Sequence, residues 1–446
     1  MIKGFYKTAL VFLTLIIIIF VSGCSSSAVK EQEKEDDLIE ALSLEVESGN
    51  MGKALKIYEE KKGNDRLLYS ILLINNGRID EAEKILIDII AENESDVTAL
   101  FYLSLVYNLK GNKELERKTL ERITAIDPDN SDANTSLGRI AASEKKYRDA
   151  EDYFRKALKN NYHEEAALGY AMVLLEQKKN DEALKQYNVI IEKNPGIMMA
   201  YIDRAYIKSL KEDYRGAEKD LDQAVNLDPD YIWNYLDRGR MRLYTGKYEK
   251  AAEDFTKVLE FDKTVFTAYV KRAEAYEESG KNELALEDYK KALEIRSDYK
   301  KGYVPIALQF FRKGEWNNAA SYFLKAYSIE KTPEYMLLGA ASYLNSGDKN
   351  KASKLVTESM PAIPRDNLLY HISRLYIDPY YEKIVLQKLN EEKKSFEKMK
   401  GMFYLAVYYD IFGKNSLSEN YYTEIINSGF PETMEYRLSS WKVSPR

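Results

Sequence analysis

The stretch FTAYVKRAEAYEESGKNELALEDYKKALEIRSDY, residues 266–299, contains the pattern that decides the fold. Apolar and small residues recur at helical spacing in each half of it, namely Tyr269, Ala273 and Tyr276, then Ala285, Tyr289 and Ala292. Gly280 lies between the halves, where the end of a helix favours a residue that tolerates positive φ. The stretch therefore predicts two helices joined by a turn.

The same unit recurs along much of the chain. An alanine of the second helix returns every 33 or 34 residues, at Ala150, Ala183, Ala217, Ala251, Ala285, Ala319 and Ala352. A small residue precedes each of them by twelve positions, at Gly138, Ala171, Ala205, Gly239, Ala273, Ala307 and Ala340. One hairpin of this kind cannot bury its apolar face alone, so we predict a stack of neighbouring hairpins that share a continuous core.

This unit resembles the tetratricopeptide repeat, in which an aromatic residue or Leu is followed four positions later by Gly or Ala. The stretches 201–205 and 235–239 match its first helix, from Tyr to Ala or Gly, and Ala319, Phe323 and Ala326 match its second. The resemblance implies an all-α fold, a right-handed superhelical solenoid of stacked helix-turn-helix repeats.

The repeats predict the domain boundaries. Well-matched units fill residues 97–366, as 97–130, 131–163, 164–197, 198–231, 232–265, 266–299, 300–332 and 333–366. Divergent pairs precede them over 38–96, and residues 367–398, which lack the pair of small residues and carry Pro379, predict a degenerate hairpin. The repeat returns in 399–446, where a final unit is followed by a capping helix from about Glu432 to Trp441.

The N-terminal residues have the composition of an export signal. Lys3 and Lys7 precede an apolar run from Ala9 to Val21, and this run is shorter than the ~20 residues that a membrane-spanning helix needs. We therefore expect residues 1–23 to be removed as a signal peptide and favour this over a permanent transmembrane anchor.

The sequence Val-Ser-Gly-Cys at 21–24 resembles the lipobox of bacterial lipoproteins, in which the Cys becomes the lipidated first residue. The resemblance implies that Cys24, the only Cys, carries a lipid anchor. Acyl chains stabilise membrane attachment by ~0.8 kcal/mol per buried methylene, so several chains anchor firmly. Residues 24–37 are small, polar and charged, which is typical of a flexible tether, although a frayed helix would also fit their second half.

Composition argues against several classes of function. Without residues 1–23, 64 Lys and Arg face 72 Asp and Glu, and the formal charge changes from −6 to −8, which disfavours nucleic-acid binding. The two histidines, His163 and His371, are far apart in sequence and form no metal motif, and no phosphate-binding loop is present. We expect no metal, no cofactor and no enzyme activity.

The resemblance to tetratricopeptide repeats implies a partner-binding groove lined by the first helices. The corresponding residues are Met199, Ile202, Tyr206, Trp233, Leu236, Arg240, Tyr244, Val270 and Glu274. Aromatic and aliphatic residues around an Arg are typical of binding hot spots, and an extended peptide or a partner helix would suit such a groove. Several of these side chains could instead pack within the array.

From these observations we expect an envelope lipoprotein that acts as a scaffold for other envelope proteins, such as cell-wall enzymes or outer-membrane assembly proteins. Ser25 after the Cys, in place of Asp, resembles lipoproteins sent to the outer membrane, which implies a position facing the periplasm. A receptor for glycan or peptide fragments and a structural spacer remain as alternatives.

Overall fold

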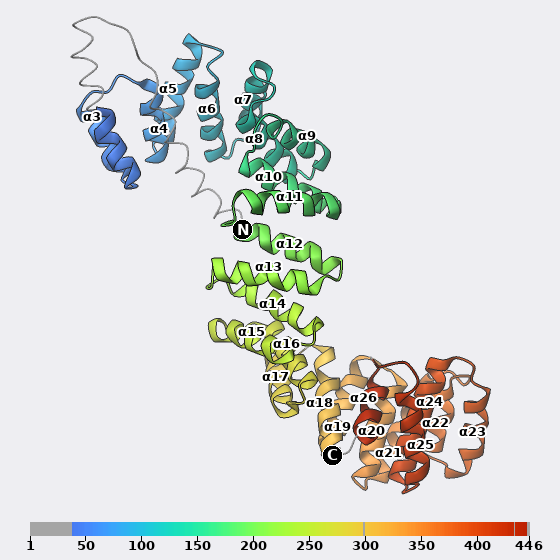
Figure 1. Ribbon diagram of the computed structural model, residues 1–446. Helices are drawn as coiled ribbons and strands as arrows, with labels where there is room; N and C mark the ends of the chain where they lie inside the picture. The colour runs from blue at the N-terminus through green and yellow to red at the C-terminus, as the bar shows by residue number, and fades with distance from the viewer. Residues whose placement is uncertain (1–37, 298, 432, 444–446) are drawn as a thin grey trace, which may run out of the picture. The chain divides into compact units, whose positions relative to one another are not determined.

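The computed structural model describes residues 38–297, 299–431 and 433–443, and this part is helical with no strand (Figure 1). The prediction of an all-α fold is confirmed for these residues. No helix among them is both long and apolar enough to span a membrane. The predictions for the signal peptide 1–23, the lipidation site Cys24 and the tether 24–37 lie outside the described residues.

The chain divides into two compact units, Met1–Ile207 and Lys208–Arg446, called here the first and the second unit. In the first unit, residues 38–47 are helical and are followed by α3 (Met51–Glu60), α4 (Arg66–Asn75), α5 (Ile79–Glu92), α6 (Val97–Leu109), α7 (Lys113–Ile126), α8 (Ser131–Ser143), α9 (Tyr147–Ala157), α10 (Glu164–Glu176), α11 (Asn180–Lys193) and most of α12 (Met198–Leu210).

The second unit contains the rest of the repeats and the C-terminal region. Its helices are α13 (Tyr214–Leu227), α14 (Ile232–Tyr244), α15 (Tyr248–Phe261), α16 (Phe266–Glu278), α17 (Asn282–Ile295), α18 (Lys300–Lys313), α19 (Trp316–Ile329), α20 (Pro333–Asn345), α21 (Lys349–Ser359), η2 (Met360–Ala362), α22 (Leu368–Leu375), η3 (Pro379–Tyr381), α23 (Glu382–Glu391), α24 (Ser395–Ile411), α25 (Asn415–Ile426) and α26 (Met434–Val443).

Consecutive helices pack as hairpins, and each hairpin packs on the next. In the second unit, α14 contacts α15, α15 contacts α16, and α16 contacts α17, as the successive labels in Figure 1 show. Gly246 and Gly280 lie in the turns between paired helices with φ of 72° and 76°, so both adopt the left-handed conformation that the sequence predicts.

The recurring small residue of the first helix makes room for an aromatic ring of the second. A Cβ atom placed on Gly239 would lie 2.7 Å from the ring of Phe255, and one on Gly138 would lie 2.8 Å from the ring of Phe154. Both rings are almost fully buried. At these two repeats the glycine of the first helix therefore leaves space for a ring sixteen residues later.

In the second unit, buried ion pairs join the two helices of a hairpin to each other. Asp254 on α15 accepts hydrogen bonds from Arg238 at 3.1 and 2.7 Å and from Arg242 at 2.8 Å, both on α14. Asp288 on α17 accepts two bonds from Arg272 on α16, at 2.7 and 2.8 Å. Because these carboxylates are buried, the pairs are structural and their arginines are not available to a partner.

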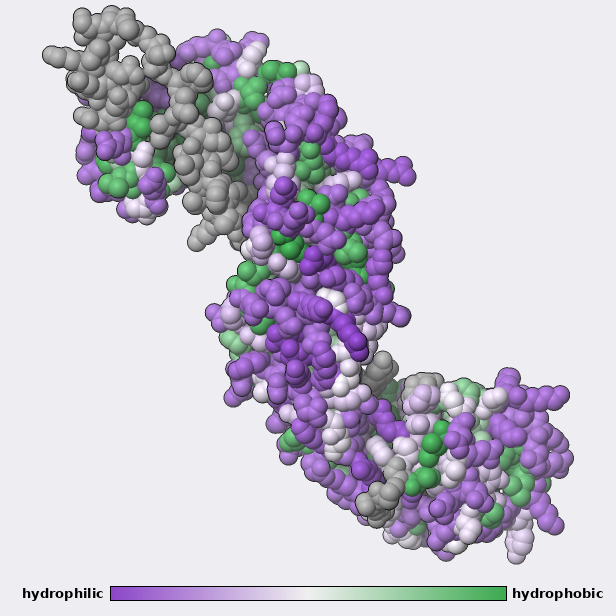
Figure 2. All heavy atoms as spheres, viewed as in Figure 1, coloured by the Kyte–Doolittle hydropathy of each residue, from purple (hydrophilic) through white to green (hydrophobic). Residues whose placement is uncertain are grey.

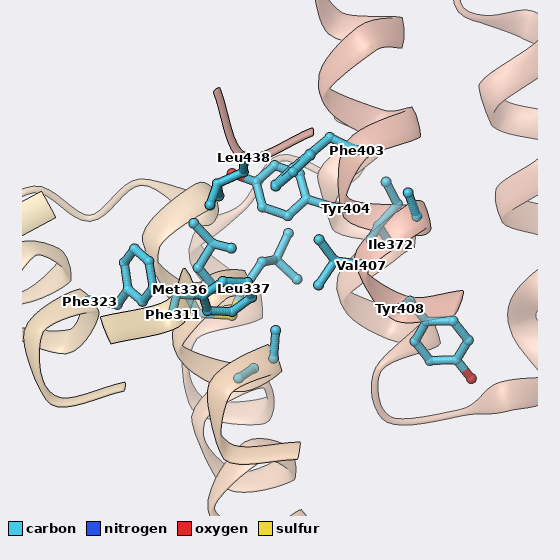
Figure 3. Close-up of a cluster of buried hydrophobic side chains, with 14 of the residues drawn as sticks. Phe311, Phe323, Met336, Leu337, Ile372, Phe403, Tyr404, Val407, Tyr408 and Leu438 are labelled. Carbon is cyan, nitrogen blue, oxygen red and sulfur yellow. The ribbon is translucent and has the colours of Figure 1, made fainter. Parts of the chain in front are cut away.

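Residues 367–398 form a hairpin of short helices, α22 and α23, joined through η3 at Pro379. Helix α18 continues through Pro305. The helix expected as a C-terminal cap is α26, and it packs on α25 and also on α18 and α24. Leu438 of α26 lies beside Phe403 and Tyr404 of α24 in the core of the second unit (Figure 3).

Candidate functional site

A stripe of side chains on α14 forms one wall of the candidate site. Trp233, Asp237, Arg240 and Tyr244 are spaced by three or four residues, so they share one face of the helix. Trp233 is 44% exposed and Tyr244 is 60% exposed, although large aromatic residues are usually more buried. The ring of Tyr244 stacks on Tyr214, the first residue of α13, with 4.5 Å between ring centroids, which fixes its position.

The matching face of α16 carries charged residues. Lys271, Glu274 and Glu278 follow the same spacing, and the Lys271 ammonium lies 2.7 Å from the Glu274 carboxylate. Arg240 on the neighbouring stripe lies 3.3 Å from Asp237. These pairs are partly exposed, so they contribute little to stability and can rearrange when a ligand binds.

These two faces border a pocket of about 470 Å³ in the second unit. Its lining residues come from α14 to α18 and from α26: Arg240, Leu243, Tyr244, Tyr248, Lys271, Glu274, Glu277, Glu278, Tyr289, Tyr299, Pro305 and Arg437. A volume in this range suits a small ligand or a few side chains of a peptide. The face of the protein that Figure 2 shows is mostly hydrophilic, with small separate hydrophobic areas.

Glu277 is the most buried charged group of the pocket. Its side chain is 9% exposed, and its carboxylate accepts hydrogen bonds from the Tyr289 hydroxyl at 2.9 Å and from the Gln309 amide at 3.2 Å. Burial raises the pKa of Glu277 above its ordinary value, although Arg437 of α26, 3.4 Å away, opposes this effect. The pocket thus combines tyrosine rings with a buried carboxylate.

The structure separates the predicted groove residues into three sets. Arg240, Tyr244 and Glu274 line the pocket, and Trp233 is exposed on the same face of α14. Leu236 and Val270 require a correction, because they are 9% and 6% exposed and pack in the interior, where a partner cannot reach them. They lie at the positions of their helices that face neighbouring helices.

The remaining predicted residues belong to α12 in the first unit. Tyr206 is 53% exposed, whereas Met199 and Ile202 are half-buried. They are described separately from the pocket, which lies within the second unit.

Sequence reasoning missed seven of the polar and aromatic pocket residues. They are Tyr248, Lys271, Glu277, Glu278, Tyr289, Tyr299 and Arg437. The spacing on α16 could have found Lys271 and Glu278, since they lie one turn on either side of Glu274. No local pattern could have found Arg437, because its position depends on the contact of α26 with α18.

The described residues contain no group of His, Cys, Asp and Glu arranged to hold a metal ion. His163 has a structural role, because its Nδ1 accepts a hydrogen bond from the backbone N–H of Ala166 at the start of α10. Its Nε2 lies 3.2 Å from a carboxylate oxygen of Asp132, which fixes the orientation of the ring.

Comparison with known families gives two matches. Residues 236–300 match the model described as tetratricopeptide repeat, and residues 70–218 match the model described as tetratricopeptide repeat protein 21 N-terminal ARM repeat. No curated protein matches the sequence.

Several solved structures are similar to parts of the chain. A tetratricopeptide repeat protein from Parabacteroides merdae is 22% identical over 55% of this chain and 97% of its own, with a TM-score of 0.39. MamA from Desulfovibrio magneticus is 18% identical over 38% of this chain and 95% of its own, with a TM-score of 0.36. YrrB, described as a tetratricopeptide repeat protein with an unusual peptide-binding site, is 18% identical over 41% of this chain and 95% of its own, with a TM-score of 0.38.

The interval between small residues, the stacked helical hairpins and the family matches agree with one another. Residues 70–218 and 236–300 are therefore similar to tetratricopeptide-type repeats, within a chain whose described part is a stack of helical hairpins.

Proposed function

We propose that this protein is a non-enzymatic interaction scaffold that binds a segment of a partner protein in the pocket between α14, α16 and α26. The observation that carries the proposal is the pocket itself, which joins the exposed Tyr244 to three cationic and three acidic side chains. Aromatic and arginine anchors of this kind dominate the energetics of protein interfaces. Repeat arrays use such extended inner surfaces for binding.

We also propose that the scaffold works in the bacterial envelope. The support for this comes from the sequence, in which a signal-type segment is followed directly by Cys24. A lipid anchor there, with a polar tether over residues 24–37, would hold the repeats at a membrane surface, and the residue Ser25 favours the outer membrane facing the periplasm. The partners would then be other envelope proteins.

The binding proposal is tested by crosslinking in cells that make the protein, followed by purification from solubilised membranes. The Trp233→Ala, Arg240→Ala double variant should lose the partner, because it removes an exposed aromatic and a pocket cation without disturbing the buried ion pairs. A matched control replaces Tyr380, which is 95% exposed on η3, and should keep the partner. Full retention of the partner by the double variant would rule out this surface as the docking site.

The localisation proposal has a separate test. Cys24→Ser removes the thiol that would carry the lipid, so the protein should move from the membrane fraction to the soluble fraction. Continued membrane retention would contradict lipid anchoring and leave the pocket proposal unaffected.

A glycan or peptide-fragment receptor and a structural spacer are distinguished by the same variants. A receptor would bind a small molecule saturably as purified protein, with loss of affinity in the double variant. A spacer would keep its cellular role after every substitution in the pocket.

A further inference from the structure

The carboxylate of Glu277 is only partly neutralised by its surroundings. Two of its hydrogen-bond donors, the Tyr289 hydroxyl and the Gln309 amide, are neutral. Its raised pKa, caused by burial, means that the folded protein does not fully compensate for the negative charge. Glu274 and Glu278, on the same helix, add negative charge nearby.

The Arg437 guanidinium, which faces Glu277, makes a weak contact with its carboxylate. Arg437 makes one contact with the carboxylate, at 3.4 Å, whereas strong Arg–carboxylate pairs have two hydrogen bonds of about 2.7–2.9 Å. Arg272 makes such a two-bond pair with Asp288 in the same unit. Arg437 is also 39% exposed and lies in the pocket wall, so another cation can reach the site that it occupies.

Helix α26 does not depend on Arg437 for its position. Leu438 and Ser439 are buried, and the Tyr404 hydroxyl donates a hydrogen bond of 3.1 Å to the Glu435 carboxylate. At the other end of the helix, the Arg312 guanidinium lies 5.1 Å from the ring centroid of Trp441. The Arg437 side chain can therefore move away from the Glu277 carboxylate while helix α26 keeps its position.

The other pocket residues suit a long cationic side chain. Tyr244, Tyr248 and Tyr299 provide ring surfaces for an alkyl stem and for a cation over a ring. The cations Lys271 and Arg240 already face the carboxylates of Glu274 and Asp237. The acidic balance of the chain, with a formal charge of −6, also favours a basic partner.

We propose that the pocket receives an arginine or lysine side chain of a partner segment, which displaces Arg437 from the Glu277 carboxylate. In the unbound protein, Arg437 pairs with the buried Glu277 carboxylate, and the cation of the partner replaces it on binding. This inference rests on the proposed function, because it names the chemistry of the segment that the scaffold binds.

The test supplies the missing cation from solution. The full chain in detergent, carrying Arg437→Ala, is titrated with N-acetyl-arginine methylamide and with the matching citrulline compound, which has the same shape without the charge. Thermal midpoints and calorimetric affinities are measured. The arginine compound should bind about tenfold or more tightly than the citrulline compound, as expected for a charge-assisted hydrogen bond, and should raise the midpoint.

Two further variants locate the effect. Adding Glu277→Gln to Arg437→Ala should abolish the preference for arginine, whereas adding Glu260→Gln, which changes an exposed carboxylate outside the pocket, should preserve it. Arg437→Gln retains more of the side chain and repeats the test if the alanine variant does not fold. Equal binding of the two compounds, or a preference that survives Glu277→Gln, would overturn the inference.

The arginine-binding test and the partner-loss test of the proposed function can fail independently. If the Trp233, Arg240 variant loses its partner while arginine and citrulline bind equally, the docking surface stands and the arginine site fails. If the partner is retained but arginine is preferred, the cation site stands and the docking function fails.

Discussion

The contact between a small residue and a ring predicts opposite effects for two glycine-to-alanine substitutions. Gly239 and Gly339 both lie inside helices, α14 and α20, so alanine should favour the helical conformation by about 1 kcal/mol at either position. At Gly239, however, the new Cβ would lie 2.7–3.1 Å from three ring atoms of Phe255. Overpacking of this kind costs roughly 1–3 kcal/mol.

At Gly339 the same Cβ would meet only the ends of Leu324 and Leu355, at 3.4–3.7 Å, which is ordinary van der Waals contact. Gly339→Ala should therefore stabilise the protein by about 1 kcal/mol, whereas Gly239→Ala should destabilise it by up to about 2 kcal/mol.

Urea unfolding of the full chain, followed by circular dichroism, measures both effects as shifts of the transition midpoint. Combining Gly239→Ala with Phe255→Leu should recover much of the loss and give a coupling energy of about 1–3 kcal/mol. If Gly239→Ala is as stable as Gly339→Ala, or if the double variant shows no coupling, the contact with the Phe255 ring does not limit the size of residue 239.

Two further predictions concern buried charges. Asp254→Asn removes the charged partner that Arg238 and Arg242 share, and it should lower the free energy of unfolding by about 3–5 kcal/mol. Glu260→Gln breaks the exposed pair with Lys257 and should lower it by less than about 1 kcal/mol in the same urea experiment. Similar losses in the two variants would contradict the structural role of the buried pairs. Because folding raises the pKa of Glu277, the folded state binds a proton at this carboxyl more readily than the unfolded state does. The stability that protonated Glu277 contributes is therefore present below pH 4.5 and is lost as the pH rises through the folded pKa. The free energy of unfolding should therefore depend less on pH in Glu277→Gln than in the wild type across that window. Glu260→Gln, which changes an exposed carboxylate outside the pocket, should follow the wild type. Parallel curves for Glu277→Gln and the wild type would count against the raised pKa.

The sequence predicts the helical hairpins well because their signals are local and repeated. Ala285 and Gly280 mark the second helix and the turn before it, and the spacing of 33 or 34 residues repeats the information many times. The interval of sixteen residues between Arg238 and Asp254, and between Arg272 and Asp288, was also visible. That these intervals mark buried ion pairs could not be predicted, because charged residues on helices are usually solvent-exposed.

The candidate site was predicted only in part. Arg240, Tyr244 and Glu274 line the pocket, and their spacing on the first helices follows the helical period. Leu236 and Val270 were misplaced, since a helix between neighbours has too narrow an exposed face for all the positions assigned to it. Arg437 depends on α26 contacting α18, a packing of distant segments that no periodic pattern encodes.

The most direct test of the docking surface is site-specific photocrosslinking in living cells. A photoreactive phenylalanine analogue replaces Tyr244 at the pocket or Tyr380 on η3, two tyrosines that are both well exposed. A discrete protein adduct is expected from position 244, where it should weaken when Arg240→Ala is added, and none is expected from position 380. An adduct from position 380 with none from position 244 would contradict it.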